Sequence, residues 1–377
     1  MTVDRVLRQA REAWEVPRDL LLQRYPPFVT GGPLPPGHVP VFVFHGLEPE
    51  TFGRKLQYLA DNGYQTLSAD EYLAVLTGTA APPERAVLLT FDDGRASLGI
   101  VGAPLLRRHG MRGIVFLVPG RTPPHPDPAP QGQPDTALLS WPEVESLAAS
   151  GPFDFQSHTL LHSRIHVAPR VVGFMAPWMR HGYAAFDVPL IERAGRDALA
   201  GEVPLGTPLL RSEPRTSESL RFHEDPAAAE ACVAAVAAGG GEAFFARRGW
   251  ERDLRRLAAG RRCEGRLEDP AQREAAIRRE VDEARRVIER HTGRPVLHLC
   301  YPWHASGPTA RRLAREAGYR TAFGGKVRGV PITPPGGDLQ AIARIGEDYV
   351  ELLPGRGRAD LASVLKRKWS RRMRGGT

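Results

Sequence analysis

Hydrophobic positions along this chain follow two alternating patterns, short continuous apolar runs and stretches with apolar residues at helical spacing. Apolar runs at residues 41–44, 86–91 and 114–118 are typical of strands that are buried in a parallel sheet. Helical patterns lie between them, for example at 51–62 and 98–109, and each is followed by a glycine that can end a helix. Strands that alternate with helices predict parallel βαβ units, and therefore an α/β fold.

The alternation stops near Pro169 and resumes near Ile277. Between these points the chain has scattered proline and glycine, an alanine-rich run at 227–238, and apolar residues at helical spacing at 244–257. This composition predicts an inserted, mainly helical lid or subdomain, with a partly disordered linker as the alternative. Because the insertion follows a strand that ends in candidate ligands, we expect it at the rim of the site.

The pattern divides the chain into five parts. They are an N-terminal helix and linker (1–38), the first part of a barrel domain (39–168), the insertion (169–275), the second part of the barrel domain (276–350) and a basic C-terminal tail (351–377). A chain of 377 residues can form one core of about 200–250 residues and an appended element.

Two adjacent carboxylates, Asp92 and Asp93, end the apolar run at 86–91 and precede Gly94. They stand where α/β proteins bind their ligands, at the carboxyl end of a parallel strand. Side chains alternate along a strand, so both acids reach one pocket only if the chain turns there, which Gly94 allows. A turn or a helix N-cap is the alternative interpretation.

Two histidines four residues apart, His158 and His162, follow the strand pattern at 153–157. This spacing lets both imidazoles face one ion from a tight loop. Two imidazoles and a carboxylate favour Zn, Fe or Co over Ca or Mg, and three protein ligands leave positions for water and substrate. The pattern therefore favours a catalytic metal site over a structural one, with a surface coincidence as the alternative.

The sequences TFDDG (90–94) and SHTLLH (157–162) together resemble the first two motifs of the polysaccharide deacetylase family, also called NodB homology or carbohydrate esterase 4. The resemblance extends over about residues 39–168 and 276–350. It is closest to the subgroup that deacetylates poly-N-acetylglucosamine, in which a strand that carries a histidine precedes TFDDG. It implies a distorted (β/α) barrel of about seven parallel strands, here interrupted by the mainly helical insertion.

The same resemblance implies roles for single residues. Asp93, His158 and His162 match the metal ligands, and Asp92 matches the general base. The third motif, which helps to bind the substrate acetyl group, corresponds to Tyr301, Pro302 and Trp303. Many members carry an arginine before this motif, where the present chain has Leu299 and Cys300; the group that orients Asp92 is therefore open, with Arg344 as a candidate.

The general acid of many family members comes from a Leu-x-His motif late in the chain. No histidine follows Phe323 here, so this motif is missing. His45 ends the apolar run at 41–44, and the matching histidine of the resembled subgroup has the role of acid. Packing at a strand end is the alternative for His45, and His298 is a second candidate acid.

These residues predict a metal-dependent N-deacetylase with one divalent ion, Zn first, with Co, Fe or Ni as alternatives. The expected substrate is an N-acetylated amino sugar in a glycan precursor, a sugar conjugate or a lipid-linked sugar. One alternative is a hydrolase of non-sugar amides or cyclic amides on the same fold. Another is an inactive deacetylase-like module that binds sugar.

The formal net charge of +8 and the sequence pI of about 9.7 raise the question of whether the protein binds an anionic partner. No nucleic-acid motif accompanies this charge, so we expect no nucleic-acid partner. The basic run at 366–374 predicts either a solvated helix end or a peripheral contact with anionic lipid. The oligomeric state is not indicated by any pattern in the sequence.

The beginning of the chain lacks an apolar secretion signal, and no apolar run reaches the roughly 18 residues of a membrane span. We therefore expect a cytoplasmic protein, peripheral at the inner membrane face if the tail binds lipid. The three cysteines, Cys232, Cys263 and Cys300, are widely spaced and predict reduced, structural thiols.

Overall fold

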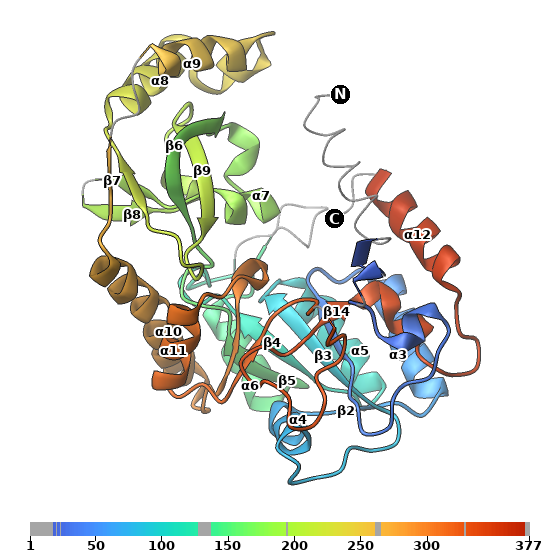
Figure 1. Cartoon of the computed structure of the whole chain (residues 1–377). Helices are drawn as coiled ribbons and strands as arrows, with labels where there is room; N and C mark the ends of the chain where they lie inside the picture. Colours follow the sequence, from blue (N-terminus) through green and yellow to red (C-terminus); the bar gives the residue numbers. More distant parts are fainter. Residues whose placement is uncertain are drawn as a thin grey trace.

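The computed structural model describes residues 18–373, apart from residues 20, 23, 127–136, 194, 261–264 and 328. Its centre is an eight-stranded sheet in which β13, β12, β5, β4, β3, β1 and β14 follow one another in this order, and β2 pairs with β3 off this path (Figure 1). All of these pairs are parallel. The bounds are β1 Val41–Phe44, β2 Gln65–Thr66, β3 Ala86–Asp93, β4 Gly113–Leu117, β5 Phe153–Ser157, β12 His298–Cys300, β13 Thr321–Phe323 and β14 Ile345–Gly346.

The sheet curls into a distorted barrel, as the sequence predicts. Its two edge strands, β13 and β14, are not paired directly. The segment that leads into β14 lies beside β13, however, because Phe323 forms a parallel bridge with Ile342 and Ala322 exchanges backbone hydrogen bonds with Leu339 and Ile342. The barrel is thus closed by residues 339–342, which lie outside the named strands, and this explains why the barrel is distorted.

Helices cover the outer face of the sheet. They are α3 Pro49–Asp61, α5 Ala103–Arg108, α6 Trp141–Ser150, α10 Pro270–Thr292 and α11 Pro308–Glu316. The longest, α10, begins at the cap residue Asp269, whose side chain accepts a hydrogen bond from Gln272 N, and ends at Gly293 in the left-handed conformation. Its buried face includes the predicted stripe, with Ile277 and Val281 fully buried.

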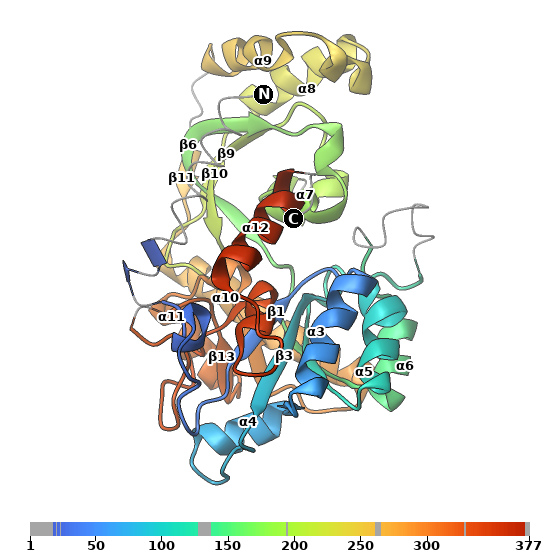
Figure 2. The same ribbon diagram turned by 90° about the vertical axis from the view of Figure 1, so that its right-hand side faces the viewer.

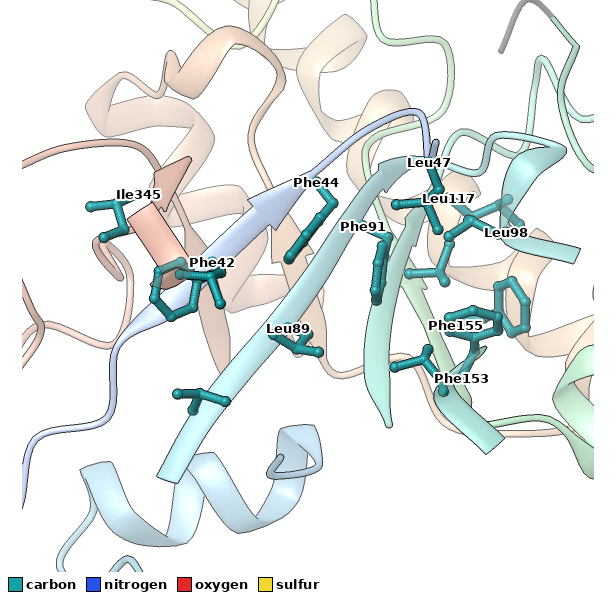
Figure 3. Close-up of a cluster of buried hydrophobic side chains, with 14 of the residues drawn as sticks. Phe42, Phe44, Leu47, Leu89, Phe91, Leu98, Leu117, Phe153, Phe155 and Ile345 are labelled. Atoms are coloured by element: carbon teal, nitrogen blue, oxygen red, sulfur yellow. The ribbon is translucent and has the colours of Figure 1, made fainter. Parts of the chain in front are cut away.

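Side chains of the sheet divide between two cores because they alternate along each strand. Phe42, Phe44, Leu89 and Phe91 belong to the outer core, between the sheet and the helices (Figure 3). Leu88 belongs to a second cluster that fills the barrel interior together with side chains of α4, Ala69–Leu76. This helix closes the end of the barrel at the bottom of Figure 1.

The insertion forms a separate layer beside the end of the barrel at which β5 finishes (Figures 1 and 2). It contains the helical stretches that the sequence predicts, α8 Ala227–Ala238 and α9 Trp250–Ala259, and a further short helix, α7 Gly182–Asp187. It also contains three two-stranded antiparallel sheets that were not expected, β6–β9, β7–β8 and β10–β11. Their bounds are β6 Arg164–Phe174, β7 Ile191–Arg193, β8 Arg196–Ala198, β9 Pro208–Pro214, β10 Phe222–Glu224 and β11 Gly265–Leu267.

The remaining parts of the chain lie at its ends. The helix predicted over the first 20 residues falls largely outside the described residues, as does Cys263. Cys232 and Cys300 are buried free thiols, in agreement with the sequence. The tail forms α12, Leu361–Met373. Among the described helices, none combines the length and the apolar character that a membrane crossing requires.

Candidate active site

Asp92 and Asp93 face one pocket because the backbone of β3 changes its conformation at the second acid. Leu88, Thr90 and Asp92 share one face of the strand by their spacing of two, and this face is the barrel interior. A regular strand would direct Asp93 to the opposite face. Asp93 has a left-handed φ of 71°, followed by Gly94 at 74°. The turn that the sequence assigns to Gly94 therefore starts one residue earlier.

His158 and His162 occupy a strained loop directly after β5. Thr159 and His162 have φ values of 64° and 49°, which are unfavourable for residues with a Cβ. The Nδ1 atom of His158 lies 2.8 Å from the carbonyl oxygen of Cys300. A carbonyl can only accept, so Nδ1 carries the proton and Nε2 keeps a lone pair that points toward the acids.

Three side chains form a group that can hold a metal ion. The Nε2 atoms of His158 and His162 each lie 3.7 Å from Oδ1 of Asp93, and the three ligand atoms lie within 4.8 Å of one another. These separations are too long for hydrogen bonds. They suit ligands of a common ion, because bonds of about 2.0–2.2 Å place two ligand atoms roughly 3–4 Å apart. The donor set is therefore one that can hold a divalent ion.

The protonation states of this group favour metal binding. Burial lowers the pKa of His158 despite the nearby Asp92 and Asp93, and burial together with His158 lowers the pKa of His162 to about 3. Burial alone would raise the pKa of Asp93, but Arg95 and His162 outweigh it and lower the pKa to about 2. At neutral pH the group thus offers two neutral imidazoles and one carboxylate.

Asp92 is held by Arg344, the candidate that the sequence left open. The guanidinium donates to both carboxylate oxygens, from Nη1 to Oδ1 at 2.7 Å and from Nη2 to Oδ2 at 2.8 Å. Both side chains are buried. Arg344 is itself fixed by bonds to Gly324 O at 2.9 Å and Thr90 Oγ1 at 3.1 Å. Burial raises the pKa of Asp92, but the charge of Arg344 dominates and holds it well below its ordinary value.

A second group, Asp92, His158 and Cys300, is also close enough to share an ion. Two observations make it a poorer metal site. Both oxygens of Asp92 are bound to Arg344. Burial also raises the pKa of the Cys300 thiol well above its ordinary value, and a protonated thiol is a weak ligand.

His45 lies on the open side of Asp92. Its Nε2 atom is 4.0 Å from Oδ2 of Asp92, and its side chain is 49% exposed, so a substrate can reach it. His298, the second candidate acid, lies at the start of β12. Its Nδ1 is 2.7 Å from Oγ1 of Thr321, and its Nε2 is 3.9 Å from Asp70, at the opposite end of the barrel interior. Of the two candidate acids, His45 is therefore the one that lies beside Asp92.

The residues of the third motif occupy different places. Tyr301 and Pro302 are buried, and Tyr301 N donates to Phe323 O at 3.1 Å, so this N–H is not available to an acetyl group. Trp303 borders the site, with its ring centroid 4.1 Å from that of His162 and a left-handed φ of 49°. Of the three, Trp303 is the side chain placed to meet a substrate.

Arg95 and the aromatic residues of α7 also belong to the site, and the sequence analysis missed them. Arg95 donates to Oδ2 of Asp93 from Nε at 3.2 Å and from Nη2 at 2.8 Å. Tyr183 and Phe186 face its guanidinium from the insertion. The position of Arg95 two residues after Asp93 was a signal for it, whereas nothing in the local sequence marks α7.

Comparisons with known proteins agree with this geometry. The polysaccharide deacetylase family model matches residues 79–174, from before β3 to the end of β6. YxkH of Bacillus subtilis, which is named as a polysaccharide deacetylase, is 27% identical over 139 residues, or 35% of this chain. The matched region spans 46% of that relative, so the relative is about twice as long as the shared part.

Two solved structures share the fold over most of the chain. A de-N-acetylase from Aggregatibacter actinomycetemcomitans has a TM-score of 0.50 and 16% identity, covering 88% of this chain and 99% of that one. The BpsB deacetylase domain from Bordetella bronchiseptica has a TM-score of 0.50 and 18% identity, covering 83% and 97%. Together with the motifs and the parallel barrel, the family match over residues 79–174 shows that the chain contains a polysaccharide deacetylase domain, also called a NodB homology or carbohydrate esterase 4 domain.

Proposed function

We propose that the protein is a metal-dependent N-deacetylase that hydrolyses the acetamide of an N-acetylated amino sugar. The observation that carries the proposal is the position of Asp92. Its Oδ2 atom lies 3.8 Å from Nε2 of His158, on the side of the metal-binding group, and 4.0 Å from Nε2 of His45, on the open side. One ionised carboxylate thus lies between a place for an ion and an accessible imidazole.

Asp93, His158 and His162 would hold the ion, with Zn as first choice and Co, Fe or Ni as alternatives. Such an ion would acidify water and polarise the acetamide carbonyl. The chain itself supplies the proton transfers. Asp92 takes the proton of the water that attacks the carbonyl carbon, and His45 gives a proton to the nitrogen as the C–N bond breaks. The products are acetate and the free amine.

An amino sugar is favoured over other amides by two features. The chain resembles the subgroup that deacetylates poly-N-acetylglucosamine, and Trp303 offers an aromatic surface next to His162. A hydrolase of non-sugar or cyclic amides is the second candidate. The inactive sugar-binding module is less compatible with the site, because it has no need of the buried Asp92–Arg344 pair beside the metal-binding group.

Acetate release from the zinc-loaded protein tests this function. The panel contains UDP-linked, lipid-linked and oligomeric N-acetylhexosamines together with simple acetanilides, and ring opening of a cyclic amide, which releases no acetate, is measured separately. We expect turnover of at least one sugar and its loss in Asp92→Asn by about 100-fold to 10,000-fold. Turnover of the non-sugar amides alone would replace the proposal by the second candidate. Sugar binding without acetate release would favour the inactive module.

We propose a cytoplasmic location with a peripheral contact between α12 and the inner membrane face. Trp369 is 58% exposed on this basic helix. Arg367 and Lys368 are paired with Glu351 at 2.7 Å and Asp348 at 3.4 Å, so they attach α12 to the barrel. Among the side chains of α12 that the structure describes, over residues 361–370, Lys366 and Trp369 are then proposed as the contact. We expect the protein to sediment with anionic vesicles but not with neutral ones, and Trp369→Ala should reduce this sedimentation. Equal binding of the unaltered protein to both vesicle types would reject the contact.

A further inference from the structure

Arg95 determines which oxygen atom of the Asp93 carboxylate is left to bind an ion. Its two hydrogen bonds to Asp93, from Nε and from Nη2, both go to Oδ2. The other oxygen, Oδ1, lies 3.7 Å from Nε2 of both His158 and His162. The guanidinium therefore occupies one oxygen and leaves the second directed toward the place for the ion. A carboxylate that is hydrogen-bonded in this way binds a metal through a fixed atom.

Arg95 is positioned in turn by the insertion. Its side chain is 0% exposed, and its Cζ atom lies 3.8 Å from the ring centroid of Tyr183 and 4.8 Å from that of Phe186. Both rings belong to α7, which lies nearer to the barrel than α8 and α9 do (Figures 1 and 2). A guanidinium over aromatic faces is attracted by their π electrons, and planar stacking restricts its orientation.

The same two aromatic residues reach other parts of the site. Phe186 packs edge to face with His162, with 5.0 Å between ring centroids. The hydroxyl of Tyr183 accepts a hydrogen bond from Gly46 N at 3.1 Å, next to His45. Arg121 connects α7 to the metal loop, since it donates to Ala185 O at 3.3 Å and to Leu161 O at 2.7 Å. One short helix thus contacts the supports of Asp93, His162 and His45.

We infer that Tyr183 and Phe186 are positioning residues for the metal: through Arg95 they fix Asp93 with Oδ1 toward the ion, so the insertion is part of the metal centre. The inference rests on the proposed function only in that the ion serves catalysis. The sequence suggests only a lid or subdomain at the rim of the site. Removal of α7 should therefore weaken metal binding itself.

Zinc titration of the metal-free full-length chain, in competition with a chelator, tests the inference without measuring turnover. Tyr183→Leu and Phe186→Leu should each weaken Zn²⁺ binding about 10-fold to 100-fold, and Arg95→Met at least as much. Tyr183→Phe keeps the ring and should bind within about twofold of the unaltered protein. Phe244→Leu is the matched control, because this buried aromatic residue of the insertion contacts Phe245 and Arg247 instead.

Thermal unfolding of the metal-free variants separates positioning from folding, since a purely structural role would lower stability and leave zinc affinity unchanged. Zinc binding by Tyr183→Leu and Phe186→Leu as tight as that of Phe244→Leu overturns the inference. If either variant does not fold, Arg95→Lys decides, because a lysine keeps the charge but loses the planar stack. Unchanged affinity in Arg95→Lys also overturns it. A failure of acetate release with the predicted zinc affinities would reject the proposed function alone.

Discussion

At the scale of single residues, the two adjacent acids of β3 have different partners and therefore different tasks. Asp92 is held through both oxygens by Arg344, which leaves it ionised but not free to ligate. Asp93 is held through one oxygen by Arg95, which leaves the other for an ion. The sequence alone could identify the acids and histidines, because they lie in two compact motifs. It could only suggest Arg344, which is 252 positions from Asp92.

Replacement of Arg344 by glutamine should destabilise the protein by about 3–5 kcal/mol at neutral pH, because Asp92 is left as a buried charge without its partner. The pKa of Asp92 is depressed in the folded protein, so the stability from this pair is present above the ordinary pKa and is lost as the pH falls through the folded-state value. Arg344→Gln should therefore differ most from the unaltered protein at neutral pH in urea denaturation. Arg367→Gln, which breaks the more exposed pair with Glu351, should change stability by at most about 1 kcal/mol. Equal effects of the two substitutions would contradict this assignment.

The role of His45 depends on the leaving group. If His45 protonates the departing nitrogen, His45→Ala should lose most activity on an acetamide and retain much more on an activated aryl acetate, whose leaving group needs no proton. Rates on the two substrates measured for the same preparation provide the comparison. His38→Ala, a histidine of the linker, serves as the control. Parallel losses on both substrates, or no loss on the amide, would reject the acid role.

At the scale of elements, the loop after β5 is held by α10. Glu280 accepts hydrogen bonds from Leu161 N at 3.0 Å and from Ser163 Oγ at 2.8 Å, on both sides of His162. The strands β1, β3, β4 and β5 and the helices of the barrel were predictable because each has a local apolar pattern of four residues or more. The strands β6 to β11 were not, because four of them have only three residues, β6 contains Pro169, and the partners of β6 and β10 are distant in sequence.

Removal of the Glu280 carboxylate should loosen the metal loop. We expect Glu280→Ala to weaken Zn²⁺ binding by about tenfold or more, because Thr159 and His162 are held in unfavourable backbone conformations that need such restraint. Glu283→Ala, at an exposed position of the same helix, is the control and should bind as the unaltered protein does. The same chelator competition measures both. Tight binding in Glu280→Ala would show that the loop keeps its conformation without α10.

At the scale of the whole molecule, acid stability should depend on His298. This histidine is buried in the barrel, and burial lowers its pKa to about 4, against 6.5 for an exposed histidine, with Asp70 opposing the shift. Below about pH 6.5, His298 of the unfolded chain binds a proton that folded His298 does not, so the free energy of unfolding falls as the pH decreases toward 4. This one group accounts for roughly 3 kcal/mol of the decrease. His298→Gln should reduce this slope in denaturation measured between pH 7 and 4. The surface variant His38→Gln should not, and an unchanged slope in His298→Gln would remove His298 as the cause.

The long-range supports of the site have a consequence for how the protein is made. A ribosome that has completed residues 1–275 has synthesised both aspartates and both histidines, but not Glu280, Cys300 or Arg344. These later residues hold the loop after β5, set the tautomer of His158 and neutralise Asp92. The nascent chain therefore carries every metal ligand long before it can arrange them. Metal loading should follow synthesis of Arg344, and the earlier intermediate should expose the three ligands to any metal in its surroundings.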